Sequence, residues 1–188
     1  DTGKRNLQGL DKPILDSLGI DKNKPEKQQR NQTGSPILEE GDILLNTTLA
    51  ETSDWQQVDL PVVSTLRHFC IETLSSYTED NQACISEVDL LDDKGQPIDK
   101  TKWEVVYVSS EQADKNLGVA ENLFDGDISS FWHTDPATEP GQPHRIIVDI
   151  KEIYKISALR FKVRKGAFLS GKVKEINVYG RPQFFLFH

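Results

Sequence analysis

Short apolar runs separated by turn residues fill most of the chain from residue 40 onward. In residues 86–91, Val88 and Leu90 are predicted to point inward, and Glu87 and Asp89 outward, with the period of two of a strand. Long helical periodicity is not found, so the pattern is typical of an all-β sandwich or barrel. Other predicted strands are Ile43–Leu45, Trp55–Leu60, Arg67–Leu74, Trp103–Val108, Ile146–Ile150, Ile156–Val163 and Val173–Tyr179, and residues 184–187 are apolar enough for a further one.

The N-terminal segment has a different composition. Residues 21–35 are charged and nearly free of apolar side chains, so they cannot bury enough surface to offset the entropy of ordering. Residues 13–20 have the pattern of one short amphipathic helical turn. We therefore predict that residues 1–37 are a linker or the tail of a preceding domain, and that residues 38–188 form one module.

Composition restricts the function further. A net charge of −8 argues against a nucleic-acid binder, which needs a basic face, and less strongly against docking on an anionic membrane. The apolar runs are much shorter than the roughly 18 residues of a membrane-spanning helix. Cys70 and Cys84 are too few for a disulfide scaffold, so one bridge or two free thiols remain open, and we favour free thiols.

One loop concentrates oxygen ligands. Asp125 and Asp127 flank Gly126, and Ser130 follows three residues after Asp127. A tight turn at the glycine brings several hard oxygens toward one point, which is the arrangement that Ca²⁺ requires. The spacing differs from that of an EF-hand. On spacing alone, a calcium loop and a polar turn between two strands are equally acceptable interpretations.

The sequence around this loop, residues 120–134, reads Ala-x-Asn-x-x-Asp-Gly-Asp-x-x-Ser-x-Trp-His-Thr. It resembles the signature of the discoidin, or factor V/VIII type C, superfamily, and is most similar to the galactose-binding-like modules of carbohydrate-binding module family 32. The resemblance covers roughly residues 40–180. It implies a jelly-roll β-sandwich with the galactose-binding-domain-like fold. The segments that extend it, in the family's order, are residues 102–111, 143–150, 159–164 and 171–179.

The order of segments departs from the family in one respect. Residues 66–72 and 85–90 resemble strands that close the family's domain, yet here they precede the aspartate loop. Either residues 40–92 finish a preceding module, or this module is permuted so that its closing strands come first. We favour permutation, because little sequence follows Tyr179 and the ends of a compact domain lie close together.

The resemblance also implies a structural Ca²⁺ that ties distant strands together. Three carboxylates among about six hard oxygens suit Ca²⁺ better than Zn²⁺. Without the resemblance, Glu87 would be interpreted as an outward strand residue in water. The implied ligands are the side chains of Glu87, Asp125, Asp127 and Ser130 and the backbone carbonyls of Ser86 and Asn122.

Catalysis is not predicted. His133, Asp135 and His144 could be interpreted as ligands of Zn²⁺ or Fe, but their spacing matches no catalytic pattern. A nucleophile elbow, a phosphate loop and a Cys-x-x-Cys pair are all lacking in the sequence.

Sugar binding is the function that the resemblance implies. His133 and Arg164 correspond to family residues that donate hydrogen bonds to the ring hydroxyls of galactose-type sugars. A surface hydrogen bond for His133 and an ion pair for Arg164 are the structural alternatives. Pro136 replaces a tryptophan on which the family stacks the sugar, and Ser170 replaces an asparagine.

The missing tryptophan requires a different aromatic platform, because stacking supplies much of a sugar site's apolar contact. Phe168 is the predicted replacement, and Tyr77 is a second candidate. We expect a secreted or surface-exposed binding module that holds an attached glycoside hydrolase, lyase or sulfatase near its substrate. The alternatives are a discoidin-type module for protein or cell-surface interaction, and a structural domain that packs on a catalytic domain.

Overall fold

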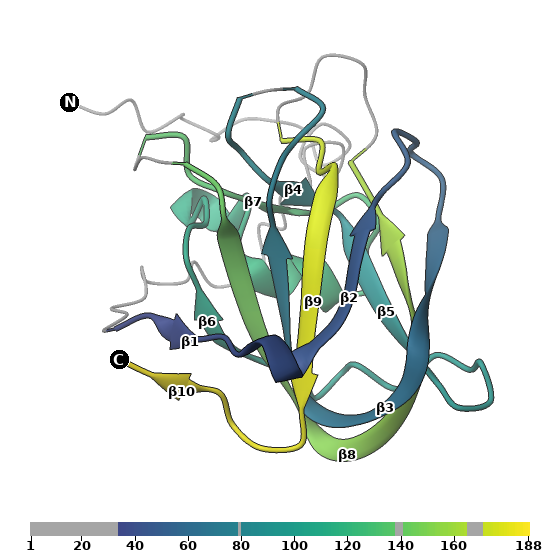
Figure 1. Cartoon of the computed structure of the whole chain (residues 1–188). Helices are drawn as coiled ribbons and strands as arrows, with labels where there is room; N and C mark the ends of the chain where they lie inside the picture. The colour runs from purple at the N-terminus through teal and green to yellow at the C-terminus, as the bar shows by residue number, and fades with distance from the viewer. Residues whose placement is uncertain (1–33, 79, 138–140, 165–170) are drawn as a thin grey trace.

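The computed structural model describes residues 34–78, 80–137, 141–164 and 171–188. These residues form an antiparallel β-structure with three short 3₁₀ helices, η1 (Glu40–Asp42), η2 (Asp114–Asn116) and η3 (Ala120–Phe124) (Figure 1). The prediction of an all-β fold is therefore confirmed. The strands are β1 (Pro36–Ile37), β2 (Ile43–Thr48), β3 (Gln56–Thr73), β4 (Cys84–Ile85), β5 (Glu87–Asp92), β6 (Glu104–Val108), β7 (Trp132–His133), β8 (His144–Lys162), β9 (Glu175–Arg181) and β10 (Leu186–Phe187).

The main sheet has the order β2-β9-β3-β8-β5, and β6 also pairs with β8. Strands β3 and β8 are long and curve together at one end of the molecule (Figure 1). Their first and second halves therefore lie in different layers. β6 pairs with the half of β8 that includes residues 144–149, and β9 pairs with the half of β3 that includes residues 68–73. β5 instead pairs with residues 156–162, in the other half of β8. The folded-over sheet makes the two layers of a sandwich.

The sequence pattern predicted two strands where the structure has one, both for β3 and for β8. The apolar pattern breaks at the bends, where the register of β3 shifts between Asp59 and Ser64 and where Lys151 has a φ of 74°. Side chains at the bends face water, and Val62 is 72% and Ile153 62% exposed. A gap in the inward-facing pattern at these points marks the bend of a continuous strand.

Large side chains from both layers and from η3 fill the space between the layers. Phe69 of β3 is fully buried, and its ring packs edge-on against Trp103, with a centroid distance of 5.5 Å. Trp103 in turn contacts Phe124 of η3 at 5.6 Å. Trp132 is also fully buried, and its Nε1 donates a hydrogen bond to the carbonyl of Ser110. The aspartate loop is thereby anchored at both ends in the core.

Both cysteines are free and buried, as expected. Burial raises the pKa of the Cys84 thiol to about 12 and also raises the pKa of Cys70. Two short strand pairs complete the fold, β4 with β7 and β1 with β10. Among the described residues, no helix has the length and apolar character needed to cross a membrane.

The segments before and after the aspartate loop lie in the same main sheet, since β3 and β5 pair with β8. Most of the predicted linker, residues 1–33, lies outside the described residues. The last residues of that predicted linker, Pro36 and Ile37, form β1 and pair with β10.

Candidate binding and metal sites

The aspartate loop follows η3 and turns at Gly126, whose φ is 79°. The backbone N–H of Asp127 donates to Asp125 Oδ1 at 2.9 Å, and the Ser130 hydroxyl donates to Asp125 Oδ2 at 2.5 Å. Asp125 therefore organises the loop from both sides. Ser130 is buried, whereas Asp125 and Asp127 are exposed.

Glu87 reaches this loop from the neighbouring strand β5. The backbone N–H of Gly126 donates to both carboxylate oxygens of Glu87, each at 3.2 Å. The expectation that Glu87 points outward is wrong, because its residue exposure is 1%. Val88, next to it, is also fully buried, as predicted. A strand covered on both faces at this point loses its alternation of buried and exposed residues.

Burial has a large electrostatic effect on Glu87. It raises the pKa of this carboxyl group to about 8, and the nearby charge of Asp125 contributes in the same direction. The ammonium of Lys100 and the N–H of Gly126 oppose the shift. A cation at this position therefore stabilises the ionised carboxylate, which is the form that a metal would need.

The predicted calcium ligands are only partly brought together. Glu87 accepts from the N–H of Gly126, and Asp125, the residue before Gly126, accepts from the Ser130 hydroxyl. These three side chains carry hard oxygens of the kind that Ca²⁺ prefers. The side chain of Asp127 turns back on its own loop, where Oδ1 accepts from the N–H and hydroxyl of Ser129 at 2.9 and 2.6 Å. Over the described ranges, no group of three or more His, Cys, Asp and Glu side chains is arranged to hold a metal.

The two predicted backbone ligands lie next to this group. The Asn122 side chain donates to the carbonyls of Asn116 and Phe131, at 3.1 and 3.0 Å, and so fixes the backbone before the loop. Ser86 joins β4 to β5, and its N–H donates to the carbonyl of Lys162 at 2.8 Å. The full calcium ligand set stays a prediction.

His133 lies on β7, opposite Cys84 of β4. It is 3% exposed, and its Nδ1 is 2.5 Å from the carbonyl oxygen of Thr134. A carbonyl only accepts, so Nδ1 carries the proton in this contact. Burial lowers the pKa of His133, and the charge of Arg164 also lowers it. A neutral imidazole with its proton on Nδ1 offers a lone pair at Nε2, whereas the resemblance implied a donor.

Arg164 lies beside His133 through a shared aromatic neighbour. Its guanidinium is 4.1 Å from the ring centroid of Phe131, and the rings of Phe131 and His133 are 6.4 Å apart. Arg164 also lowers the pKa of the Cys84 thiol, against the larger effect of burial. The two predicted sugar-binding residues are thus brought together. The contact of Phe131 with Arg164 was not predicted from the sequence.

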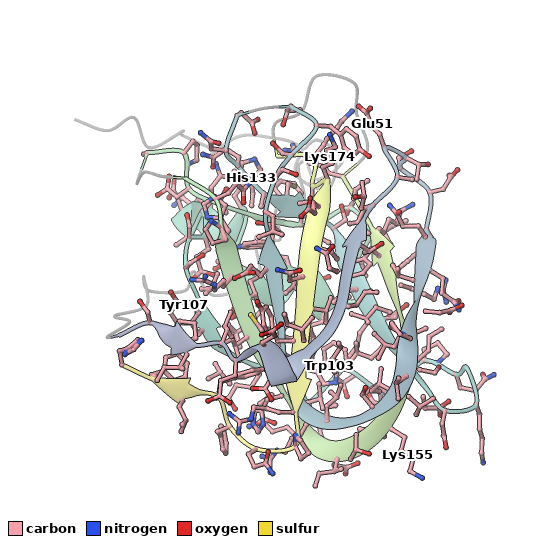
Figure 2. The ribbon with its side chains drawn as sticks, in the orientation of Figure 1. Glu51, Trp103, Tyr107, His133, Lys155 and Lys174 are labelled. Carbon is pink, nitrogen blue, oxygen red and sulfur yellow. The ribbon has the colours of Figure 1, made fainter. Side chains whose placement is uncertain are left out.

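The aromatic platforms are less well defined. Phe168 and Ser170 lie outside the described residues. Tyr77, the second candidate, donates from its hydroxyl to the carbonyl of Leu49 at 2.7 Å, and the Lys174 ammonium is 5.5 Å from its ring. Figure 2 shows His133 and Lys174 at the same end of the molecule, away from Trp103 and Lys155.

The alternative metal site at His133, Asp135 and His144 is not assembled in the described ranges. His144 Nε2 is 2.7 Å from the carbonyl of Asn81, and His133 contacts the carbonyl of Thr134. Both imidazoles therefore hold neighbouring backbone in place.

The described residues form a β-sandwich in which the aspartate loop connects η3 to β7. Residues 105–183 match the F5/8 type C domain family, which confirms the resemblance for this part of the chain. The chain is also 33% identical, over 84 residues, to a sialidase from Micromonospora viridifaciens. This similarity spans 44% of the chain but 13% of the sialidase. It therefore concerns one segment of that protein.

Proposed function

We propose that this chain is a non-catalytic carbohydrate-binding module that directs an attached glycan-active enzyme to galactose-type glycans or polysaccharide. The observation that carries the proposal is the convergence of Arg164 and His133 on Phe131, inside the segment similar to F5/8 type C domains. A cationic donor and a neutral imidazole side by side suit a sugar, whose hydroxyls both donate and accept.

In this proposal, the two side chains have complementary roles. Arg164 donates to the oxygen of a sugar hydroxyl, and His133, which lies beside Arg164 through Phe131, shapes the wall of the site next to it. Because Phe131 lies against the guanidinium, it limits the orientations that Arg164 can adopt. Less ordering entropy is then lost when the sugar binds.

The proposal includes one structural Ca²⁺. Glu87, Asp125 and Ser130 would hold it together with the carbonyls of Ser86 and Asn122, and Asp127 would join after a change of its side-chain rotamer. The ion would supply positive charge between β5 and the aspartate loop. The protein's own contribution is the N–H of Gly126, which already joins this loop to Glu87.

The location and partners are also proposed. Sialidase is the name of the similar protein, and an enzyme on glycans gains from a tethered binding module because tethering raises the effective concentration of substrate. We therefore propose a secreted or cell-surface protein whose partners are a glycan and a catalytic domain in the same parent chain.

The test compares the wild type with Arg164→Ala on a glycan array at millimolar Ca²⁺, followed by calorimetry with the best ligand. We expect the variant to lose at least about tenfold in affinity for galactose- or N-acetylgalactosamine-terminated glycans. Arg160→Ala is the matched control, because Arg160, on β8, also lies over an aromatic ring, that of Trp55 at 4.9 Å, and neither residue belongs to the proposed sugar site. Equal binding by all three proteins would contradict the proposed site.

A second function is a protein-interaction module without sugar affinity. The burial of His133, 3% exposed, favours it, because a sugar must reach the imidazole. Exposed apolar side chains near the C-terminal end favour it too, since Phe184 is 56% and Leu186 59% exposed. A glycan array without hits, from a protein that still folds, would support this function over the first.

A further inference from the structure

Lys100, which the sequence analysis did not single out, has a fully hydrogen-bonded ammonium group beside the proposed calcium site. It lies in the connection between β5 and β6, and its side chain is 17% exposed. The Nζ atom donates to Glu87 Oε2, to Asp89 Oδ1 at 2.5 Å and to the carbonyl of Val88 at 3.2 Å. An ammonium has three protons, and these three acceptors satisfy all of them.

The same carboxylate of Glu87 also faces the aspartate loop, through the N–H of Gly126. Glu87 therefore lies between two positive charges, the ammonium of Lys100 on one side and the proposed Ca²⁺ at Asp125 and Ser130 on the other. A carboxylate can accept from two cations, but two positive charges within a few ångströms repel each other strongly at a buried position.

We propose that Lys100 sets the Ca²⁺ affinity of this site by competing with the ion for Glu87. This inference rests on the proposed calcium site. If Ca²⁺ displaces the ammonium, the lost hydrogen bonds weaken binding, and if both remain, their repulsion weakens it. Without Ca²⁺, Lys100 neutralises the buried carboxylate and preserves the contact between β5 and the loop. The site therefore responds to the ambient Ca²⁺ concentration, while the fold persists when the ion is absent.

The experiment measures Ca²⁺ binding by calorimetry, and thermal unfolding in chelator and in Ca²⁺, for the wild type and Lys100→Met. We expect Lys100→Met to bind Ca²⁺ about tenfold more tightly than the wild type. In chelator, it should unfold at a lower temperature than the wild type, because Glu87 has lost its cation. Added Ca²⁺ should raise its unfolding temperature by more than that of the wild type.

Two further variants separate charge from position. Lys102→Met removes the same charge from an exposed side chain in the same connection, and Lys100→Arg keeps a charge near Glu87. Both should behave like the wild type. Equal Ca²⁺ affinity in the wild type and Lys100→Met would show that Lys100 does not compete with Ca²⁺, although the calcium site itself exists. Failure of both proteins to bind Ca²⁺ would overturn the calcium site and the competition together.

Discussion

Gly171 and Gly126 both have a positive φ, of 76° and 79°, but their surroundings differ. A Cβ at Gly171 would lie 3.0 Å from the backbone carbon of Ala83 and from the backbone nitrogen of Cys84, whereas nothing lies within 4 Å of a Cβ at Gly126. Left-handed backbone alone costs a side-chain-bearing residue about 1 to 2 kcal/mol. A collision with backbone adds to that cost, because backbone cannot rotate away.

We therefore expect Gly126→Ala to lower the free energy of unfolding by about 1 kcal/mol, and Gly171→Ala by about 3 kcal/mol. Urea denaturation of both variants, without added Ca²⁺, measures the difference. Similar losses for the two variants would mean that the contact of residue 171 with β4 relaxes at little cost.

At the scale of single residues, sequence reasoning was right where a side chain interacts locally and failed where its partner is distant. The burial of Val88 and Leu90 followed from their spacing. The burial of Glu87 did not, because its partner Gly126 is 39 positions away. Family resemblance nevertheless selected Glu87, although the pattern of the strand placed it in water.

At the scale of elements, a partly buried ion pair joins β3 to β8 near the place where both curve. Arg67 Nε and Nη2 donate to Asp149 Oδ1 and Oδ2 at 2.9 and 3.1 Å. Burial alone would raise the pKa of Asp149, but the bonds from Arg67 and from the N–H of Lys151 outweigh it and leave the pKa below its usual range. This contribution to stability is therefore present above the unfolded pKa of about 3.9 and is lost as the pH falls through the lower folded value.

The variant Arg67→Met tests this pair. It should be less stable than the wild type at neutral pH. The difference should narrow as the pH falls below about 4, where Asp149 becomes protonated in the unfolded state, until the pH is below the lower folded pKa of Asp149. Lys155→Met is the control, since it removes one positive charge from an exposed position on β8. A difference that stays constant down to acid pH would assign the effect of Arg67 to packing instead of charge.

Strand existence was predicted more accurately than strand length. Each half of β3 and β8 has a clear apolar pattern, so the sequence predicted the halves. Their continuity depends on pairing with each other across the bend, which is a contact between residues far apart in the chain. Positions 62 and 153 look like a loop in the sequence because their side chains are exposed at the curve.

At the scale of the molecule, one core connects the two layers to the aspartate loop through Phe69, Trp103 and Phe124. Phe69→Ala should lower the free energy of unfolding by about 3 to 5 kcal/mol, because it leaves a cavity at the centre of the sandwich. Phe184→Ala, the same substitution at an exposed position, should cost about 1 kcal/mol or less.

Urea titrations measure the free energy of unfolding of both variants, with tryptophan fluorescence and far-ultraviolet circular dichroism as the two signals. Because the core is shared, the two signals should change together in one transition. Separate transitions would indicate that residues 43–92 and 104–181 unfold as independent units. That result would contradict a single core shared through the main sheet.

The pairing of β1 with β10 has a consequence for engineering. Pro36 lies opposite Phe187 and Ile37 opposite Leu186, so the chain enters and leaves the sandwich at one corner (Figure 1). Paired strands are separated by about 5 Å, a gap that the two sides of a surface loop can bridge. The described segment can therefore be spliced into a loop of an unrelated host protein without forcing the host's backbone apart. Such a chimera would carry the sandwich as a side branch of the host, and two short spacers would suffice to join them.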